Sequence, residues 1–189
     1  MKKILSITLA TLVAISASAA SLDWSVASKS FTTSDGSSAR AGGYLVTVFY
    51  ATDFSSVQGA IADLVSATAT ANSTGITSAI SSIDALTKGT GVTKATGATS
   101  GIIDDSSIAL GTELNIFIVA WDANSIADAT SYLVSDFAST TAYTAPTTPT
   151  TNGAFESSSF GNAKWTAVPE PASAMLALAG VAMLIRRRK

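Results

Sequence analysis

The chain has 189 residues and contains neither cysteine nor histidine, which excludes disulfides, cysteine-ligated zinc and the usual Ser-His-Asp catalytic triad. Its formal charge of −2 is unevenly distributed, because residues 21–168 carry 5 basic and 12 acidic side chains (5 − 12 = −7), while six of the eleven basic residues lie at the two ends. An acidic body argues against nucleic-acid binding, and cationic ends indicate membrane targeting instead.

The first twenty residues have the layout of a secretory signal peptide, with two lysines, an apolar run and a small-residue end. Ala17 and Ala19 satisfy the small-x-small requirement of signal peptidase, which predicts cleavage before Ala20 or one residue later. We therefore assign residues 1–20 to the signal peptide. A retained membrane anchor is the alternative.

The segment 21–167 contains all aromatic residues of the chain and is expected to form one exported domain. Period-two alternation predicts strands over residues 44–50 and 113–121. Both alternate sets of the second strand are apolar, which predicts a central strand covered on both faces. Shorter strands are expected at residues 22–26, 132–134 and 163–168.

Two amphipathic helices interrupt these strands. The first covers residues 53–65, where Ser55 and Gln58 have the spacing of a capping box. The second covers residues 73–89 and is expected to end with Lys88 in its last turn and a glycine stop.

The glycine-rich residues 89–101 predict a flexible loop or weak hairpin, and the Thr- and Pro-rich residues 139–151 predict a long exposed loop. The fold class is therefore a β-dominated α+β domain, either an antiparallel sheet or a sandwich with about two helices. An N-terminal signal helix and a C-terminal membrane helix are expected in addition.

Two loops carry weak signals for ligand binding. Asp122, Asn124 and Asp128 supply oxygens that could hold calcium, but the EF-hand pattern is incomplete and turn formation is favoured. The stretch 89–94 is similar to a phosphate loop but lacks its Gly-Lys-Ser/Thr ending. We expect no cofactor and no metal.

Two alternative functions stay open for the body. A carbohydrate-binding module would stack sugar rings on exposed indoles, for which Trp24, Trp121 and Trp165 are the candidates. A carboxylate-based hydrolase would need two carboxyl groups facing each other across a cleft. The candidate carboxylates for that reaction are Asp104, Asp105, Glu113 and Asp122.

The last 22 residues, 168–189, form a three-part tail. Residues 172–185 are uncharged and mostly apolar, and as a helix they span roughly 21 Å, short of the ~30 Å hydrocarbon core. The basic residues 186–189 predict that the end of this marginal membrane helix stays in the cytoplasm. The other parts are the box Val168, Pro169, Glu170 and Pro171, and the cluster Arg186, Arg187 and Arg188.

Placed after a signal peptide, this tail resembles the PEP-CTERM sorting signal of Gram-negative bacteria, which is also labelled an ice-binding protein C-terminal domain. The resemblance covers about 22 residues and all three parts of the pattern. It implies recognition by a membrane sorting enzyme of the exosortase type, which acts near the Pro-Glu-Pro box. The ice-binding label describes the tail alone.

We therefore expect an exported, non-enzymatic protein of the cell envelope or extracellular matrix. It would be anchored in the inner membrane through its C-terminus before processing, and afterwards lie at the cell surface or be secreted. The expected partners are the export machinery, signal peptidase, the sorting enzyme and the inner membrane, with extracellular polysaccharide as a further candidate and no nucleic acid.

Overall fold

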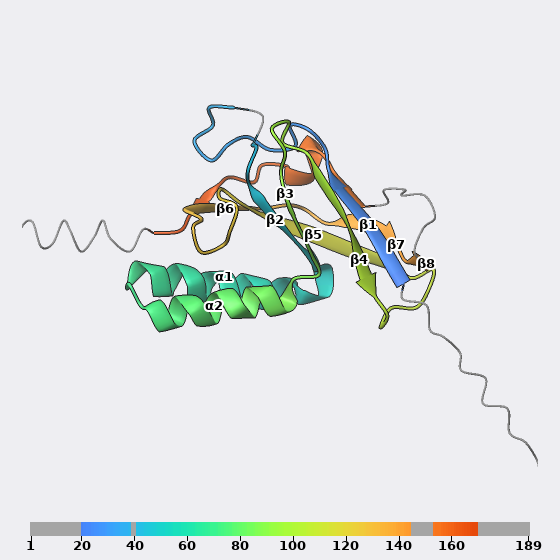
Figure 1. The fold of residues 1–189 in the computed structure, drawn as a ribbon, viewed down its shortest axis with the longest axis horizontal. Helices are drawn as coiled ribbons and strands as arrows, with labels where there is room; N and C mark the ends of the chain where they lie inside the picture. The colour runs from blue at the N-terminus through green and yellow to red at the C-terminus, as the bar shows by residue number, and fades with distance from the viewer. Residues whose placement is uncertain (1–19, 39–40, 145–152, 170–189) are drawn as a thin grey trace, which may run out of the picture.

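The computed structural model describes residues 20–38, 41–144 and 153–169 (Figure 1). The expected signal helix and C-terminal membrane helix both lie outside these residues. Within them, no helix is long and apolar enough to cross a membrane.

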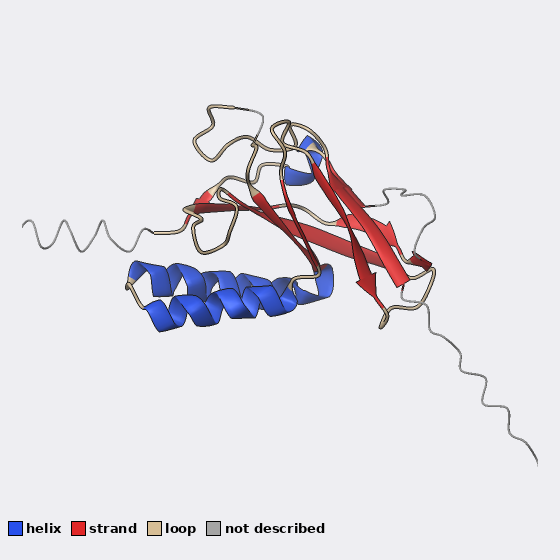
Figure 2. Ribbon diagram, in the orientation of Figure 1, coloured by secondary structure: helices blue, strands red, loops and turns tan. Residues whose placement is uncertain are grey.

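Two β-sheets face each other (Figures 1 and 2). The four-stranded sheet has the order β4-β1-β8, and β9 also pairs with β1. Its strands are β1 (Ala20–Val26), β4 (Thr99–Asp105), β8 (Tyr143–Thr144) and β9 (Gly153–Phe155). The six-stranded sheet has the order β10-β6-β5-β2-β3, and β7 also pairs with β5. Its strands are β2 (Leu45–Tyr50), β3 (Gly89–Val92), β5 (Glu113–Trp121), β6 (Ser131–Val134), β7 (Ala138–Thr141) and β10 (Thr166–Ala167).

A helical hairpin forms the third layer, on the outer face of the six-stranded sheet (Figure 2). It is inserted between β2 and β3 and consists of α1 (Phe54–Ala69), preceded by the 3-10 turn η1 (Ala51–Asp53), and α2 (Ser73–Leu86). A second 3-10 turn, η2 (Ser157–Phe160), follows β9. All strand pairs are antiparallel except β1–β9, so the β-dominated α+β class with two helices is confirmed.

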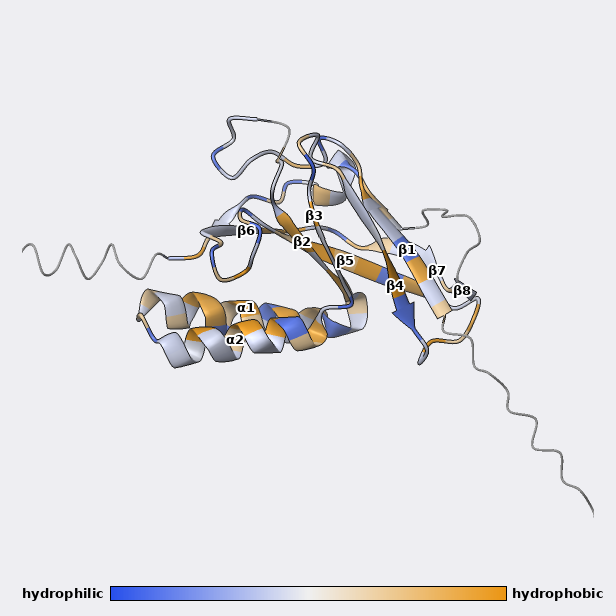
Figure 3. Cartoon of the chain, viewed as in Figure 1, coloured by the Kyte–Doolittle hydropathy of each residue, from blue (hydrophilic) through white to orange (hydrophobic). Residues whose placement is uncertain are grey.

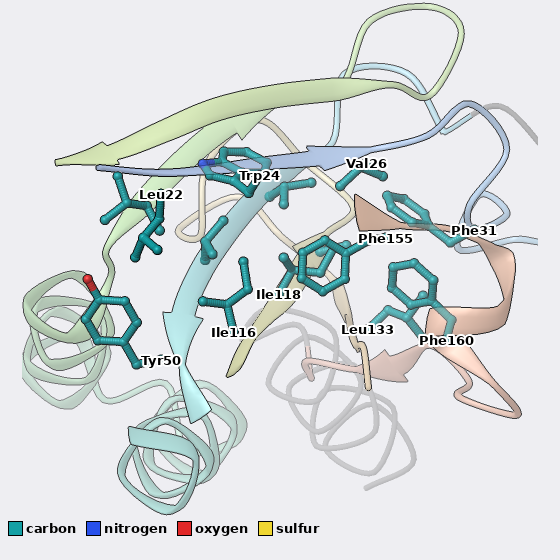
Figure 4. Close-up of a cluster of buried hydrophobic side chains, with 14 of the residues drawn as sticks. Leu22, Trp24, Val26, Phe31, Tyr50, Ile116, Ile118, Leu133, Phe155 and Phe160 are labelled. Atoms are coloured by element: carbon teal, nitrogen blue, oxygen red, sulfur yellow. The ribbon is translucent and has the colours of Figure 1, made fainter. Parts of the chain in front are cut away.

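Strand β5 is central because its two faces serve two different cores. Ile116 and Ile118 point into the space between the sheets, where they meet Trp24 and other residues of β1 (Figure 4). Phe117 and Val119 point the other way, toward the helices. Every residue from Ile116 to Trp121 is buried, which confirms the prediction of a strand covered on both sides.

Helix α2 begins at Ser73 as predicted, but the start of α1 and the end of α2 differ from the predictions. Helix α1 continues directly from a 3-10 turn, so its N-cap is Asp53 and no side chain caps it. Ser55 therefore lies inside the first turn, and the predicted capping box is wrong. Helix α2 ends at Leu86, and Lys88 lies beyond it, where its backbone N–H donates to the carbonyl of Val48 in β2.

The glycine-rich segment 89–101 is neither a flexible loop nor a hairpin. Its two strands belong to different sheets, since β3 pairs with β2 and β4 pairs with β1. The glycines make room for the buried indole of Trp24: an added Cβ at Gly91 or Gly101 would lie 3.0 or 2.8 Å from the ring. The low strand propensity of glycine is thus overridden by packing against Trp24.

The predicted loop 139–151 is also wrong over its first part. Strand β7 covers Ala138–Thr141 and β8 follows at Tyr143, with Ala142 buried between them. This step carries the chain from the six-stranded sheet to the four-stranded sheet, because β7 pairs with β5 and β8 pairs with β1. Residues 145–152 lie outside the described residues.

Candidate functional site

The last strand of the described residues, β10, ends immediately before the Val-Pro-Glu-Pro box. Strand β10 pairs with β6 through Thr166 and Ala167. The next residue, Val168, donates its backbone N–H to the carbonyl of Thr130 at 2.7 Å, and its side chain is 6% exposed. The first residue of the box is therefore part of the fold.

The loop that holds Val168 is organised by Asp122. One carboxylate oxygen accepts hydrogen bonds from the backbone N–H groups of Thr130 (2.8 Å) and Ser131 (2.9 Å), and the other accepts from the Thr130 hydroxyl (2.7 Å). Charged acceptors make the stronger class of hydrogen bond. Thr130 is thereby fixed from one side by Asp122 while its carbonyl holds Val168.

The same loop contains the three residues that were candidates for binding calcium. Both oxygens of Asp122 are used within the loop, Asp128 accepts a hydrogen bond from the Ser125 hydroxyl at 2.6 Å, and Asn124 is exposed. In the described part of the chain, no three acidic side chains are grouped closely enough to hold a metal ion.

A hollow of about 290 Å³ opens beside Val168. Its walls come from both helices, from the loop after β5 and from the end of the described chain. They include Leu64, Thr68, Ile76, Ile126, Val168 and Pro169. The C-terminal end of the domain therefore combines a fixed backbone with an apolar recess, and nothing in the sequence pattern of the tail indicates the recess.

The remaining sorting and processing residues divide between the two ends. Ala20 is the first residue of β1, is 1% exposed and pairs with Asp105 and Thr144. The start of β1 lies at the opposite end of the domain from the end of the described chain after β10 (Figure 1). Outside the described residues lie Ala17, Ala19, Glu170, Pro171, Arg186, Arg187 and Arg188.

The tryptophans do not form an exposed platform. Trp24 and Trp121 are 1% and 0% exposed, so neither can stack on a sugar. Trp165 is half-buried, donates its indole N–H to the carbonyl of Thr32, and meets Phe31 and Tyr44 edge-on.

The candidate hydrolase carboxylates are not paired along the strands that carry them. Glu113 and Asp122 lie at the two ends of β5, roughly 30 Å apart at about 3.3 Å per residue. Glycosidase pairs need a separation below about 10 Å. Asp104 and Asp105 are consecutive strand residues at the hydrophilic end of β4, so they face opposite sides of the sheet (Figure 3).

A polar cluster that sequence reasoning missed lies at the edge between the sheets. Tyr50 donates its hydroxyl to Asp105 at 2.8 Å, and Lys88 lies 5.1 Å from the centre of the Tyr50 ring. Hydrogen bonds from the Ser107 side chain and backbone, with that from Tyr50, lower the pKa of Asp105, and burial raises the pKa of Tyr50. Because these residues come from separate elements, only the fold unites them.

The glycines and lysine of the phosphate-loop stretch serve other purposes. Gly89 and Gly91 lie in β3 against Trp24, and Lys94 closes the turn before β4 by donating its backbone N–H to the carbonyl of Ala98.

Comparison of the chain with family models, with curated proteins and with solved structures finds no match.

Proposed function

We propose that this protein is exported through its N-terminal signal peptide and sorted through its C-terminal Pro-Glu-Pro box by a membrane enzyme of the exosortase type. Its body would act in the cell envelope or extracellular matrix without enzymatic activity of its own. In the unprocessed protein, residues 172–185 would hold the body at the inner membrane.

One observation supports this proposal above the others: β10, the last strand of the described residues, ends immediately before the box. Val168 is buried and hydrogen-bonded to Thr130, and Pro169 is half-buried. A proline cannot extend the strand pairing of β10, because it has no backbone N–H to donate. An enzyme approaching from the membrane would therefore meet the box directly after the last described strand.

The position of Ala20 supports the first of the two predicted signal-peptidase cleavage sites, the one before Ala20. Because β1 begins at Ala20, cleavage after Ala19 leaves the strand complete, with seven residues from Ala20 to Val26. Cleavage one residue later removes a side chain that is 1% exposed in the core. We therefore propose that the mature chain begins at Ala20.

The test is mass spectrometry of the protein from cells that contain a sorting enzyme of this type. Replacing Pro169, Glu170 and Pro171 together with alanine is expected to leave the C-terminus unprocessed. The matched control replaces the other two prolines, Pro146 and Pro149, with alanine and is expected to be processed normally. Normal C-terminal processing of the triple variant would contradict the sorting proposal.

A further inference from the structure

The hollow beside Val168 lies at the C-terminal end of the described residues. Its lining includes the apolar side chains of Leu64, Ile76, Ile126, Val168 and Pro169. Two hydroxyls also line it: that of Thr68, a residue 7% exposed, donates to the carbonyl of Leu64 at 2.7 Å, and that of Thr130 donates to Asp122 at 2.7 Å. Neither hydroxyl is therefore a free donor for a polar ligand, and the recess suits an apolar occupant.

The apolar segment of the chain starts within reach of this recess. Pro169 lines the recess, and only Glu170 and Pro171 separate it from Ala172. Three residues of fully extended chain span at most about 11 Å. The first apolar residues, 172–176 (Ala-Ser-Ala-Met-Leu), are therefore held close to the recess at high effective concentration.

Other occupants fit less well. The apolar run of the signal peptide leads to the start of β1, at the far end of the domain (Figure 1). Anionic lipid headgroups attract clusters of Lys and Arg. The residues that line the recess include no basic side chain and one acidic one, Asp128.

We propose that this recess seats residues 172–176 whenever the C-terminal segment is not inserted in a membrane. Seating removes these apolar residues from water, where an exposed apolar stretch of this kind promotes association. The proposal does not require processing by a sorting enzyme, so it stands or falls separately from the proposed function.

The absence of cysteine from the chain makes the test free of background. We would introduce the recess pair, Ala127→Cys with Ala174→Cys, because Ala127 is exposed on the rim of the recess. The control pair joins Ala174→Cys with Ala167→Cys, an exposed position of β10 that does not line the recess and is closer to residue 174 along the chain. Both pairs are placed in the whole chain, synthesised without lipid or detergent, and oxidised mildly.

Disulfide formation requires Cα atoms within about 7 Å, so its rate reports the position of the segment. The disulfide of the recess pair is expected to form at least about tenfold faster than that of the control pair, and to slow when Ala129→Leu narrows the recess. Equal rates for the two pairs would overturn the proposal.

Two further outcomes would also overturn it. Disulfides of the recess pair that form only between molecules would make a second copy the occupant. In the other outcome, phosphatidylcholine vesicles protect the thiol at position 127 from a soluble maleimide, and no internal crosslink forms. That result would assign the recess to the membrane instead.

Discussion

The hydroxyl of Tyr50 donates a 2.8 Å hydrogen bond to the carboxylate of Asp105, and this bond joins the last residue of β2 to the last residue of β4. The two strands belong to different sheets, so the bond crosses the sandwich at its edge. Lys88 lies over the same phenol ring and completes a polar boundary to the apolar core.

Replacing Tyr50 with phenylalanine is expected to lower the free energy of unfolding by about 1 kcal/mol, the usual net contribution of such a bond at a partly exposed site. Urea denaturation measures this difference. Tyr132→Phe is the control, because among the described residues the Tyr132 hydroxyl has no hydrogen-bond partner, and we expect a change below about 0.5 kcal/mol. Equal losses in both variants would assign the effect to the ring environment rather than to the bond.

Acidification is expected to weaken the protein partly through Asp105. Hydrogen bonds from Ser107 and Tyr50 lower the pKa of this carboxyl in the folded state below its ordinary value of 3.8. Its stabilising contribution is therefore complete above that ordinary value and is lost as the pH falls through the folded value. The free energy of unfolding should fall less steeply between about pH 5 and about pH 2 in Asp105→Asn than in the wild type. Ser107→Ala should give an intermediate slope, and parallel profiles for all three proteins would refute this assignment.

Asp23 is a buried carboxylate with neither oxygen hydrogen-bonded and only 3% of the residue exposed. A buried charge without partners costs several kcal/mol, and a neutral amide costs less. Asp23→Asn is therefore expected to raise the free energy of unfolding by about 1–3 kcal/mol, measured by urea denaturation.

The control for this prediction is Asp104→Asn. Its side chain is exposed on the same outer face of the four-stranded sheet, since Asp104 pairs with Ser21, two residues before Asp23 on β1. We expect a change within about 0.5 kcal/mol there. A loss of stability in Asp23→Asn would show that the carboxylate has a partner in solution.

Gly101→Ala tests whether glycine is needed at this position to make room for the indole of Trp24. The new Cβ would lie 2.8 to 2.9 Å from three atoms of an indole that is 1% exposed, so ring or strand must shift. Overpacking of this kind costs about 1–3 kcal/mol of unfolding free energy. Gly59→Ala in α1 meets nothing within 4 Å and should instead stabilise by about 0.5–1 kcal/mol. Thermal unfolding compares the two variants. A stabilising effect of Gly101→Ala would show that the indole of Trp24 does not require glycine there.

These elements show where sequence reasoning succeeds. Strand β5 was predictable over its full length from Glu113 to Trp121, because both of its faces are apolar and alternation marks them directly. The helices were predictable from their apolar stripes, and α2 begins at Ser73 as predicted. The start of α1 was not predictable, since the 3-10 turn before it depends on the preceding strand.

What sequence reasoning missed depends on distant partners. Glycine and threonine have no local preference that predicts β3, and only the indole of Trp24 explains why glycines are needed there. The same holds for the candidate site: the box is visible in the sequence, whereas the hold of Thr130 on Val168 and the recess beside it join segments that are far apart in the chain.

The position of β1 has a consequence for the kinetics of folding. Its partners are β4, β8 and β9, which all lie far along the chain: Ala20 pairs with Asp105, and Trp24 pairs with Gly153. Contacts of such sequence separation form slowly, because a long loop must close before any of them stabilises the chain. A chain emerging N-terminus first would therefore keep β1 unpaired until synthesis had passed Thr99, just beyond the midpoint of the 189 residues.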